Sequence, residues 1–311
     1  MNVIELISVT PAMLESNVPE SDAPPWKAGT YKVGDTVIKN HHVFESLADG
    51  NTVEPGAETA TPLKWLDKGA TNRWRMFDKG ASQLVGETTA QRRVYLIGTQ
   101  TSNPGSIDIT INPGSVVSAV ALFGLSGYRV TVTMTDPFDG VVYERVVSLV
   151  DASAKGMWEW LFKPVKRRTT VALLDLPAYG TAPIRIVVEA DAGGTATCSM
   201  AAVGLLNEVG EACFGSSVGI TDFSRKDVDP FGNETLVEGG FRDRVQYDVR
   251  IETDDVAYQR DFLRSLRAKG AVYIGDPARQ ETIIFGRYRD LQIVLSNPAV
   301  SECALDVGAL L

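Results

Sequence analysis

The sequence predicts a mainly β protein with three parts: a small aromatic β module, a β-sandwich of the jelly-roll type, and a C-terminal α+β domain that is mostly β. Three observations support this fold class. Strand-sized segments rich in Val, Ile and Thr fill residues 90–206. Short alternating segments, broken by turn residues, precede them. Only one later segment has helical spacing. A chain of 311 residues is long enough for two or three domains.

Residues 1–22 predict a strand followed by a linker. The apolar residues Val3, Ile4, Leu6 and Ile7 lie near the start, and we expect them to pair as a strand with a later domain. The segment "VPESDAPP" follows, with three prolines in eight residues. Because proline fixes φ and lacks a backbone donor, this segment marks a boundary.

Residues 23–65 predict a compact module in which turns such as Gly34-Asp35 separate short strands. A unit of this size has little core of its own, so its stability depends on its aromatic side chains. These are Trp26, Tyr31, Phe44 and Trp65. Two interpretations stay open: the rings form the core of the module, or at least one is exposed and binds a sugar or a partner protein. Trp26, Tyr31 and Phe44 are the candidate carbohydrate-binding residues.

Residues 66–89 predict a rigid connection between the module and the sandwich. The stretch "WLDKGATNRWRMFD" is rich in large rings and fits neither helical nor strand spacing. We call it the clasp, and its candidate residues are Trp65, Asn72, Arg73, Trp74, Phe77 and Asp78. Trp65 is expected to close the module, and Trp74 and Phe77 to be buried against the sandwich. The polar members would supply the hydrogen bonds that an irregular backbone lacks.

Residues 90–206 predict the sandwich. The segment "YRVTVTM" alternates, with Val130 and Val132 on one face and Thr131 and Thr133 on the other, as in a half-buried antiparallel strand. Eight such segments favour a jelly roll. They are "RRVYLIG", "SIDITI", "VVSAVALFGL", "YRVTVTM", "GVVYERVVSLV", "TTVALLDL", "PIRIVVEA" and "ATCSMAAVGLL".

Residues 207–311 predict the α+β domain. Strand segments surround "DDVAYQRDFLRSLRAKG", the one convincing helix. Asp254 or Asp255 is the expected N-cap, and Gly270 is the expected stop. The apolar stripe of this helix is Val256, Phe262, Leu263 and Leu266.

The formal net charge of −9 argues against nucleic-acid binding, which requires a basic surface. No run approaches the 18 apolar residues of a membrane span, so membrane insertion is not expected. The start of the chain lacks the basic region of a signal peptide. Cys198, Cys213 and Cys303 form no CxxC pair and are expected to be free thiols in a reducing cytosol.

Residues with catalytic or metal-binding patterns are few, and we predict no enzyme, no cofactor and no metal site. His41 and His42 are adjacent, so in a strand they would point to opposite faces. Asp227, Asp229 and Asn233 resemble a calcium loop only faintly, and a polar β-loop is the alternative. A glycosidase carboxylate pair stays open, because the fold and not the sequence sets its spacing.

The module resembles the small chitin-binding type of carbohydrate module found on secreted glycosidases. The residues that carry this resemblance are Trp26, Tyr31, Gly34, Asp35, Val37, Phe44, Pro55 and Trp65. In that family the tryptophan and tyrosine positions shape a sugar-facing surface, and Gly-Asp makes a hairpin turn. Here "KNHHVF" stands where the family has a Tyr-x-Gly turn.

The order of module, "NRWRMFD" stretch, jelly roll and C-terminal region resembles tail proteins of long-tailed bacteriophages over residues 23–311. The jelly roll resembles their galactose-binding-like domains. This resemblance implies a structural protein of the tail tip or baseplate, assembled in the host bacterial cytoplasm and located in the virion. Its implied partners are other phage tail proteins and further copies of the same chain, with a host cell-surface glycan as an additional one. A free carbohydrate-binding protein is the alternative, and a glycan-degrading enzyme is a third.

Overall fold

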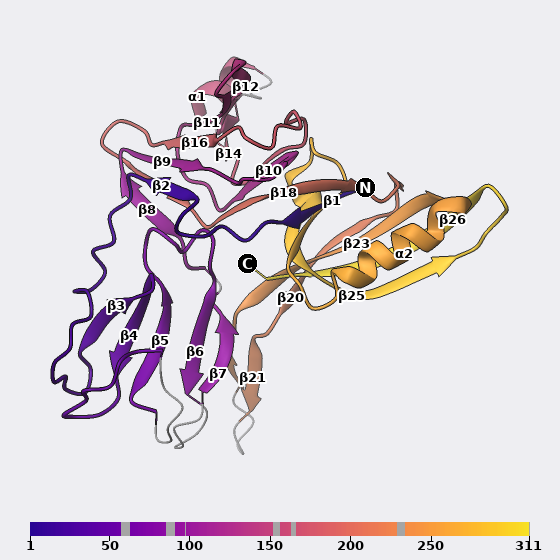
Figure 1. Ribbon diagram of the computed structural model, residues 1–311. Coiled ribbons are helices and arrows are strands. Elements are labelled where there is room, and N and C mark those ends of the chain that lie inside the picture. The colour runs from indigo at the N-terminus through magenta and orange to yellow at the C-terminus, as the bar shows by residue number, and fades with distance from the viewer. Residues whose placement is uncertain are drawn as a thin grey trace.

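The computed structural model describes residues 1–56, 63–84, 91–96, 98–151, 156–162, 166–228 and 234–310. Strands hold 51% of the chain and helices 7%, which confirms the prediction of a mainly β fold. Figure 1 shows the jelly roll with the small module below it on one side and the C-terminal sheet, crossed by one helix, on the other.

Two antiparallel sheets form the jelly roll. The first has the order β12-β11-β16-β9-β2, and the second begins with β15-β10-β18-β1. The first sheet consists of β12 (Gly140–Ser148), β11 (Arg129–Asp136), β16 (Ile184–Glu189), β9 (Ser106–Ile111) and β2 (Leu14–Ser16). The second consists of β15 (Val171–Leu173), β10 (Ala119–Phe123), β18 (Met200–Glu208) and β1 (Asn2–Leu6).

Chain order and sheet order together identify the topology. Along the chain the eight strands are β1, β9, β10, β11, β12, β15, β16 and β18. Apart from the hairpin of β11 and β12, successive strands alternate between the two sheets, as in a double Greek key, with β1 beside β18 and β9 beside β16. The predicted jelly roll is therefore present, and its first strand comes from the N-terminal residues.

The core between the two sheets comes from the period-2 pattern of their strands. In β10 the apolar run has no polar face, because Val120 and Leu122 enter this core while Ala119 and Ala121 enter another on the opposite side. The sandwich core contains Ile107, Ile109, Ile111, Val120, Leu122, Val130, Val132, Met134, Ile184, Ile186 and Val188.

Strand β1 joins the jelly roll to the C-terminal domain. It pairs with β18 on one side and with β24 (Ala271–Ile274) on the other, so one sheet of ten strands runs through both parts. Val3 and Ile4 are fully buried, and they enter two different cores. The expectation that the N-terminal residues pair with a later domain is confirmed.

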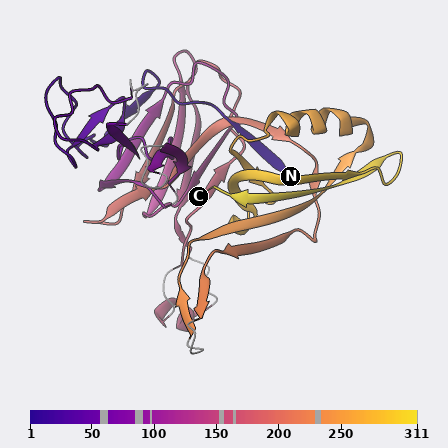
Figure 2. The same cartoon turned by 90° about the horizontal axis from the view of Figure 1, so that it is seen from below.

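Beyond β24 the sheet continues through β25 (Ile283–Val294), β26 (Val300–Ala309) and β23 (Phe241–Glu252) to β19 (Glu211–Ala212), and β20 (Ser217–Asp222) also pairs with β23. A 3₁₀ turn at Gln280–Thr282 precedes β25. Helix α2 (Val256–Ser265) lies on the outer face of this sheet, as Figure 2 shows from below.

The predicted helix is present, but its ends differ from the prediction. A 3₁₀ turn at Thr253–Asp255 leads into α2, and its backbone carbonyl at Thr253 accepts from the N–H of Val256. Asp255 occupies the N-cap position, but its side chain makes no capping bond. The helix ends at Ser265, and the chain reverses through Ala268 at φ 63°, before Gly270.

The aromatic module is inserted between β2 and β8 (Thr101–Pro104), and β8 pairs with β17 (Thr195–Cys198). Its sheet is β3 (Thr36–Lys39), β4 (His42–Ser46) and β5 (Trp65–Ala70). The first six residues of the stretch predicted as an irregular clasp are therefore a strand of the module, because they pair with β4. Beside it lies a hairpin of β6 (Gly80–Leu84) and β7 (Gln91–Tyr95).

This hairpin corrects the strand assignment. The sequence predicts "RRVYLIG" as the first sandwich strand, but among the described strands β7 pairs with β6 alone. Local alternation indicates a strand without specifying its partner. In the jelly roll, β1 occupies the position predicted for this segment. The predicted boundary at residues 89 and 90 lies outside the described residues, as do Asp229 and Asn233.

Two extensions project from this body. One follows β12 and contains β13 (Val150–Asp151), helix α1 (Met157–Phe162) and β14 (Lys166–Arg167). The other continues β20 and β23 outward as the hairpin of β21 (Arg225–Val228) and β22 (Glu234–Val237). Figure 1 places them at opposite ends of the molecule.

Candidate functional site

The three candidate carbohydrate-binding rings, Trp26, Tyr31 and Phe44, are all half-buried. Tyr31 contacts Trp65 edge to face at 5.2 Å between ring centroids. Its hydroxyl donates to the carbonyl of Lys27 at 2.8 Å and accepts from the N–H of that residue. The Nζ atom of Lys39 lies 4.4 Å from the centroid of the Trp26 ring. The rings thus pack within the module, and each keeps part of its surface accessible.

The Trp65 side chain lies in the core of the module. It is 2% exposed, and its Nε1 donates to the carbonyl of Val53 at 2.7 Å. Beside it, Asn51 is fully buried and donates to the carbonyl of Lys64 and to the hydroxyl of Ser46. A small unit with few apolar residues is therefore held by one large ring and a satisfied polar cluster.

Trp74 in the clasp is 7% exposed, as expected, and contacts Phe77 at 6.0 Å between ring centroids. Phe77 is half-buried and packs against the sandwich core, which the fully buried Met76 enters. Sequence reasoning did not single out Met76, although it is the residue of this stretch that lies in that core. The clasp is therefore packed on the jelly roll through two apolar side chains.

The polar clasp residues bond two other segments of the chain, the N-terminal linker and strand β8. Asn72 donates to the carbonyl of Ser102 at 2.7 Å and accepts from its N–H at 2.9 Å. Arg73 donates through Nε to the carbonyl of Val18 at 2.7 Å. Arg75, which the sequence analysis passed over, pairs with Asp22 at 2.6 Å. These bonds attach the N-terminal linker and the sandwich to the turn of the clasp that contains Asn72, Arg73 and Arg75.

His42 is the electrostatic centre of this junction. Its Nδ1 lies 2.9 Å from Oδ1 of Asp67, and its Nε2 lies 3.2 Å from Oδ2 of Asp78. Hydrogen bonds to Asp67 first, and then to Asp78, raise the pKa of His42 to about 9 despite its burial. The imidazole is consequently charged at neutral pH and links the module sheet to the clasp.

His41 contacts the same junction, contrary to the expectation that the two histidines face apart. Asn40 and His41 both have positive φ, 48° and 64°, and form the two-residue turn between β3 and β4. From this turn the His41 ring lies 4.8 Å from Trp74, and its Nδ1 contacts Glu20 at 2.8 Å. Neighbours alternate faces in a strand but not in a tight turn, so the strand argument did not apply.

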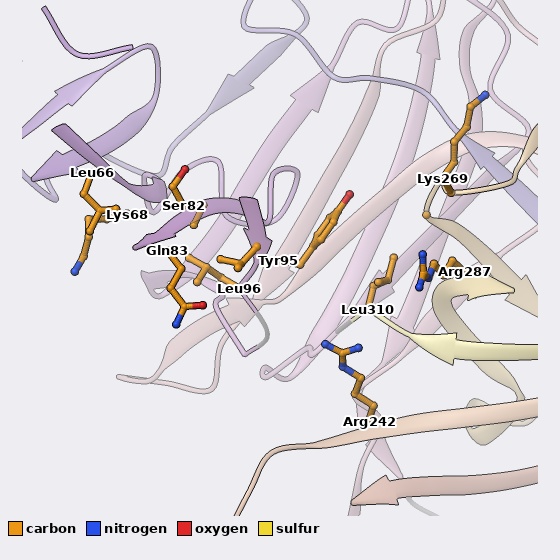
Figure 3. Close-up of a pocket in the computed structure, with 14 residues that line it drawn as sticks. Leu66, Lys68, Ser82, Gln83, Tyr95, Leu96, Arg242, Lys269, Arg287 and Leu310 are labelled. Carbon is orange, nitrogen blue, oxygen red and sulfur yellow. The ribbon is translucent and has the colours of Figure 1, made fainter. Parts of the chain in front are cut away.

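A separate cleft of about 800 Å³ lies between the β6–β7 hairpin and the C-terminal sheet. The described residues that line it include four cationic side chains and no carboxylate; the cations are Lys68, Arg242, Lys269 and Arg287. Figure 3 shows Tyr95 projecting into this space, with Leu310, Arg242 and Arg287 across from it. The amino groups of Lys68 and Lys269 point away from that centre. No sequence motif marked these residues, because they are distant along the chain.

Two of the three cysteine thiols and one lysine are buried, whereas Cys213 is half-buried. Burial raises the pKa of the Cys198 thiol to about 12 and that of Cys303 to about 11. Lys79 is 5% exposed, and burial lowers its pKa to about 8. Within the described ranges, no three His, Cys, Asp or Glu residues form a group that could hold a metal ion. In the same part of the chain, no helix has the length and hydrophobicity needed to span a membrane.

Large apolar side chains are exposed on both extensions. On α1 these are Met157, Trp158, Leu161 and Phe162. On the other extension they are Phe223, Leu236 and Val237, and on the ends of β20 and β23 that lead into it they are Val218, Ile220 and Phe241. A two-stranded hairpin exposed on both faces has little stability of its own, and clustered apolar side chains mark contact surfaces.

A comparison with models of known protein families, with curated proteins and with solved structures found no match to this chain. The features of the molecule that bear on its function are therefore the fold, the junction, the cleft and the two apolar extensions.

Proposed function

We propose that this chain is a structural component of the tail tip or baseplate of a long-tailed bacteriophage, that it forms a homo-oligomer, and that it lies in the virion after assembly in the host bacterial cytoplasm. The observation that carries this proposal is the pair of apolar extensions at opposite ends of a body whose parts are fixed to one another. The order of module, clasp, jelly roll and C-terminal domain supports the same class.

The extensions favour assembly over a role as a free monomer. Ile220 is 68% exposed and Leu236 is 78% exposed, although both belong to strands. At the other end Trp158 is 73% exposed and contacts Phe162 at 4.1 Å between ring centroids. Burying such side chains against another chain contributes roughly 1.5–3 kcal/mol each.

The positions of the extensions favour a head-to-tail contact between copies. Since α1 and the β21–β22 hairpin lie at opposite ends, a copy can offer one to each neighbour (Figure 1). Contacts of this heterologous kind generate closed rings, or open stacks when the rotation does not close. Both are arrangements that a tail tip uses to surround or extend the tail axis.

The first test is the assembly of the purified chain. Ile220→Asp and Trp158→Asp each disrupt one end, so each variant alone should sediment as a monomer. Mixed in equal amounts they should form dimers, because each supplies the end that the other lacks. Leu295→Asp is the matched control, since Leu295 is also 68% exposed but lies outside both extensions. Monomeric wild-type protein, or variants that still assemble alone, would refute the head-to-tail contact.

The second test concerns the particle. Mass spectrometry of purified phage should detect the chain in several copies per virion. A free carbohydrate-binding protein is the alternative, favoured by the accessible parts of Trp26, Tyr31 and Phe44. It predicts a chain absent from the particle and saturable chitin binding that Trp26→Ala weakens.

A further inference from the structure

We infer that the cleft between the β6–β7 hairpin and the C-terminal sheet binds an acidic saccharide, through Arg242 and Arg287 on one wall and Tyr95 on the other. This site is separate from the aromatic module. The proposed tail protein would then have an acidic saccharide as a ligand. Binding of this saccharide is a property of the isolated chain and is tested on it.

The arginines of this cleft have no acidic partner among the described residues, unlike Lys68, which pairs with Glu45 at 3.1 Å. Arg244, two residues beyond Arg242 on the same face of β23, makes a bidentate pair with Asp306 at 2.7 and 2.9 Å. Among the described residues, neither Arg242 nor Arg287 forms an ion pair or a side-chain hydrogen bond, and the guanidinium of Arg242 lies 5.6 Å from the Phe223 ring. In a chain of net charge −9, these two guanidinium groups carry unpaired positive charge. Their unsatisfied donors fit an anion from outside.

The sheet register places these two cations on one wall. Arg287 and Arg244 are both opposite Gly308 in β26, so they share a row across the sheet. Arg242 lies one pleat further along β23 and therefore on the same face. Figure 3 shows both guanidinium groups on the side of the cleft that faces Tyr95.

The opposite wall is suited to a sugar ring. Tyr95 is 57% exposed, and its flat ring can stack on the apolar face of a pyranose. Ser82 and Gln83 on β6 line the same cleft and can bond hydroxyl groups. A planar carboxylate matches the donor fork of a guanidinium, so a uronic acid combines the features that both walls recognise.

Nucleic acid fits this cleft less well. Its affinity depends on many phosphate contacts, and only two guanidinium groups point into the space, on a chain whose overall charge is negative. An open cleft of about 800 Å³ accommodates a short oligosaccharide. Inorganic phosphate shares only the negative charge of an acidic saccharide.

The test is calorimetric titration of the full chain with a tetrasaccharide of galacturonic acid. A tetrasaccharide of neutral galactose and inorganic phosphate are the comparison probes. We expect saturable binding of the acidic sugar only, weakened about tenfold by Arg242→Gln or Arg287→Gln, an amount equal to about 1.4 kcal/mol. Tyr95→Ala should weaken it as well, and added salt should lower the affinity.

Arg145→Gln is the matched control, because Arg145 is an exposed β12 arginine that does not line the cleft. It should bind as the wild type does, and so should Trp26→Ala. Circular dichroism spectra identical to that of the wild type establish that each variant is folded. Equal binding of neutral sugar or of phosphate alone, or full affinity in Arg242→Gln/Arg287→Gln, would overturn the inference. None of these outcomes changes the expected particle composition, so the proposed function is tested separately.

Discussion

At the scale of single residues, the junction between module and jelly roll depends on His42 and Trp74. Sequence analysis identified the ring-rich clasp and the burial of Trp74, because large rings in an irregular segment need a core to enter. It missed the charge at His42. The carboxylates of Asp67 and Asp78 meet this imidazole only after β4 pairs with β5 and the clasp folds back. Such contacts depend on tertiary structure and leave no local pattern.

His42 should make the stability of the protein dependent on pH. Its pKa is raised from 6.5 to about 9, so its contribution is fully present below pH 6.5 and is lost as the pH rises through 9. The difference in unfolding free energy between wild type and His42→Gln should therefore shrink over this interval, by at most about 3 kcal/mol. Urea titrations of both proteins at several pH values measure it.

The wild type must be compared with His42→Gln because the titration of Lys79 changes the stability of the protein with pH in the opposite direction. Burial lowers its pKa from 10.5 to about 8, so stability from this group increases as the pH rises from 8 to 10.5. A difference between wild type and His42→Gln that stays constant from pH 6 to 10 would contradict the role of His42.

Trp74 should be a large contributor to stability. Trp74→Ala removes a ring that is 7% exposed and contacts His41 and Phe77, so it should cost about 3–5 kcal/mol. Trp158→Ala removes the same side chain from a site 73% exposed and should change the stability of the monomer by less than about 0.5 kcal/mol. Equal costs in denaturant unfolding would contradict the packing of the clasp.

At the scale of elements, the sequence located the strands well and their partners less well. Each of the eight predicted sandwich segments contains a strand, because β-branched residues with turn residues between them are a local signal. The place of β7 beside β6, and of β1 in the middle of a ten-stranded sheet, depends on pairing between distant residues. The alternation within a strand specifies which side chains share a face and not which strand lies beside it.

The pairing of β1 with β18 should be sensitive to one glycine. A Cβ at Gly204 would lie 1.9 Å from the carbonyl oxygen of Glu5, so Gly204→Ala must push β1 away. The expected cost is about 1–3 kcal/mol. Gly219→Ala is the matched control, because a Cβ there meets nothing within 4 Å and reduces the entropy of the unfolded chain. Thermal unfolding in which both variants behave alike would contradict the close approach of β1 and β18.

At the scale of the whole molecule, β1 turns two predicted domains into one connected body. Its two faces enter separate cores, one shared with α2 and one enclosed by β10, β18, β24 and β25. The cleft and the opposed apolar extensions depend on the arrangement of the whole molecule. In the cleft, Tyr95, Arg242 and Arg287 come from segments that the sequence alone does not bring together. A body of this kind, with a contact surface at each end, suits a repeated structural unit.

Single-particle imaging of the purified phage can locate the chain in the particle. We expect several symmetry-related copies of the chain at the distal end of the tail, with α1 of one copy against the β21–β22 hairpin of the next. Absence of the chain from the particle, or its location away from the tail, would contradict this expectation.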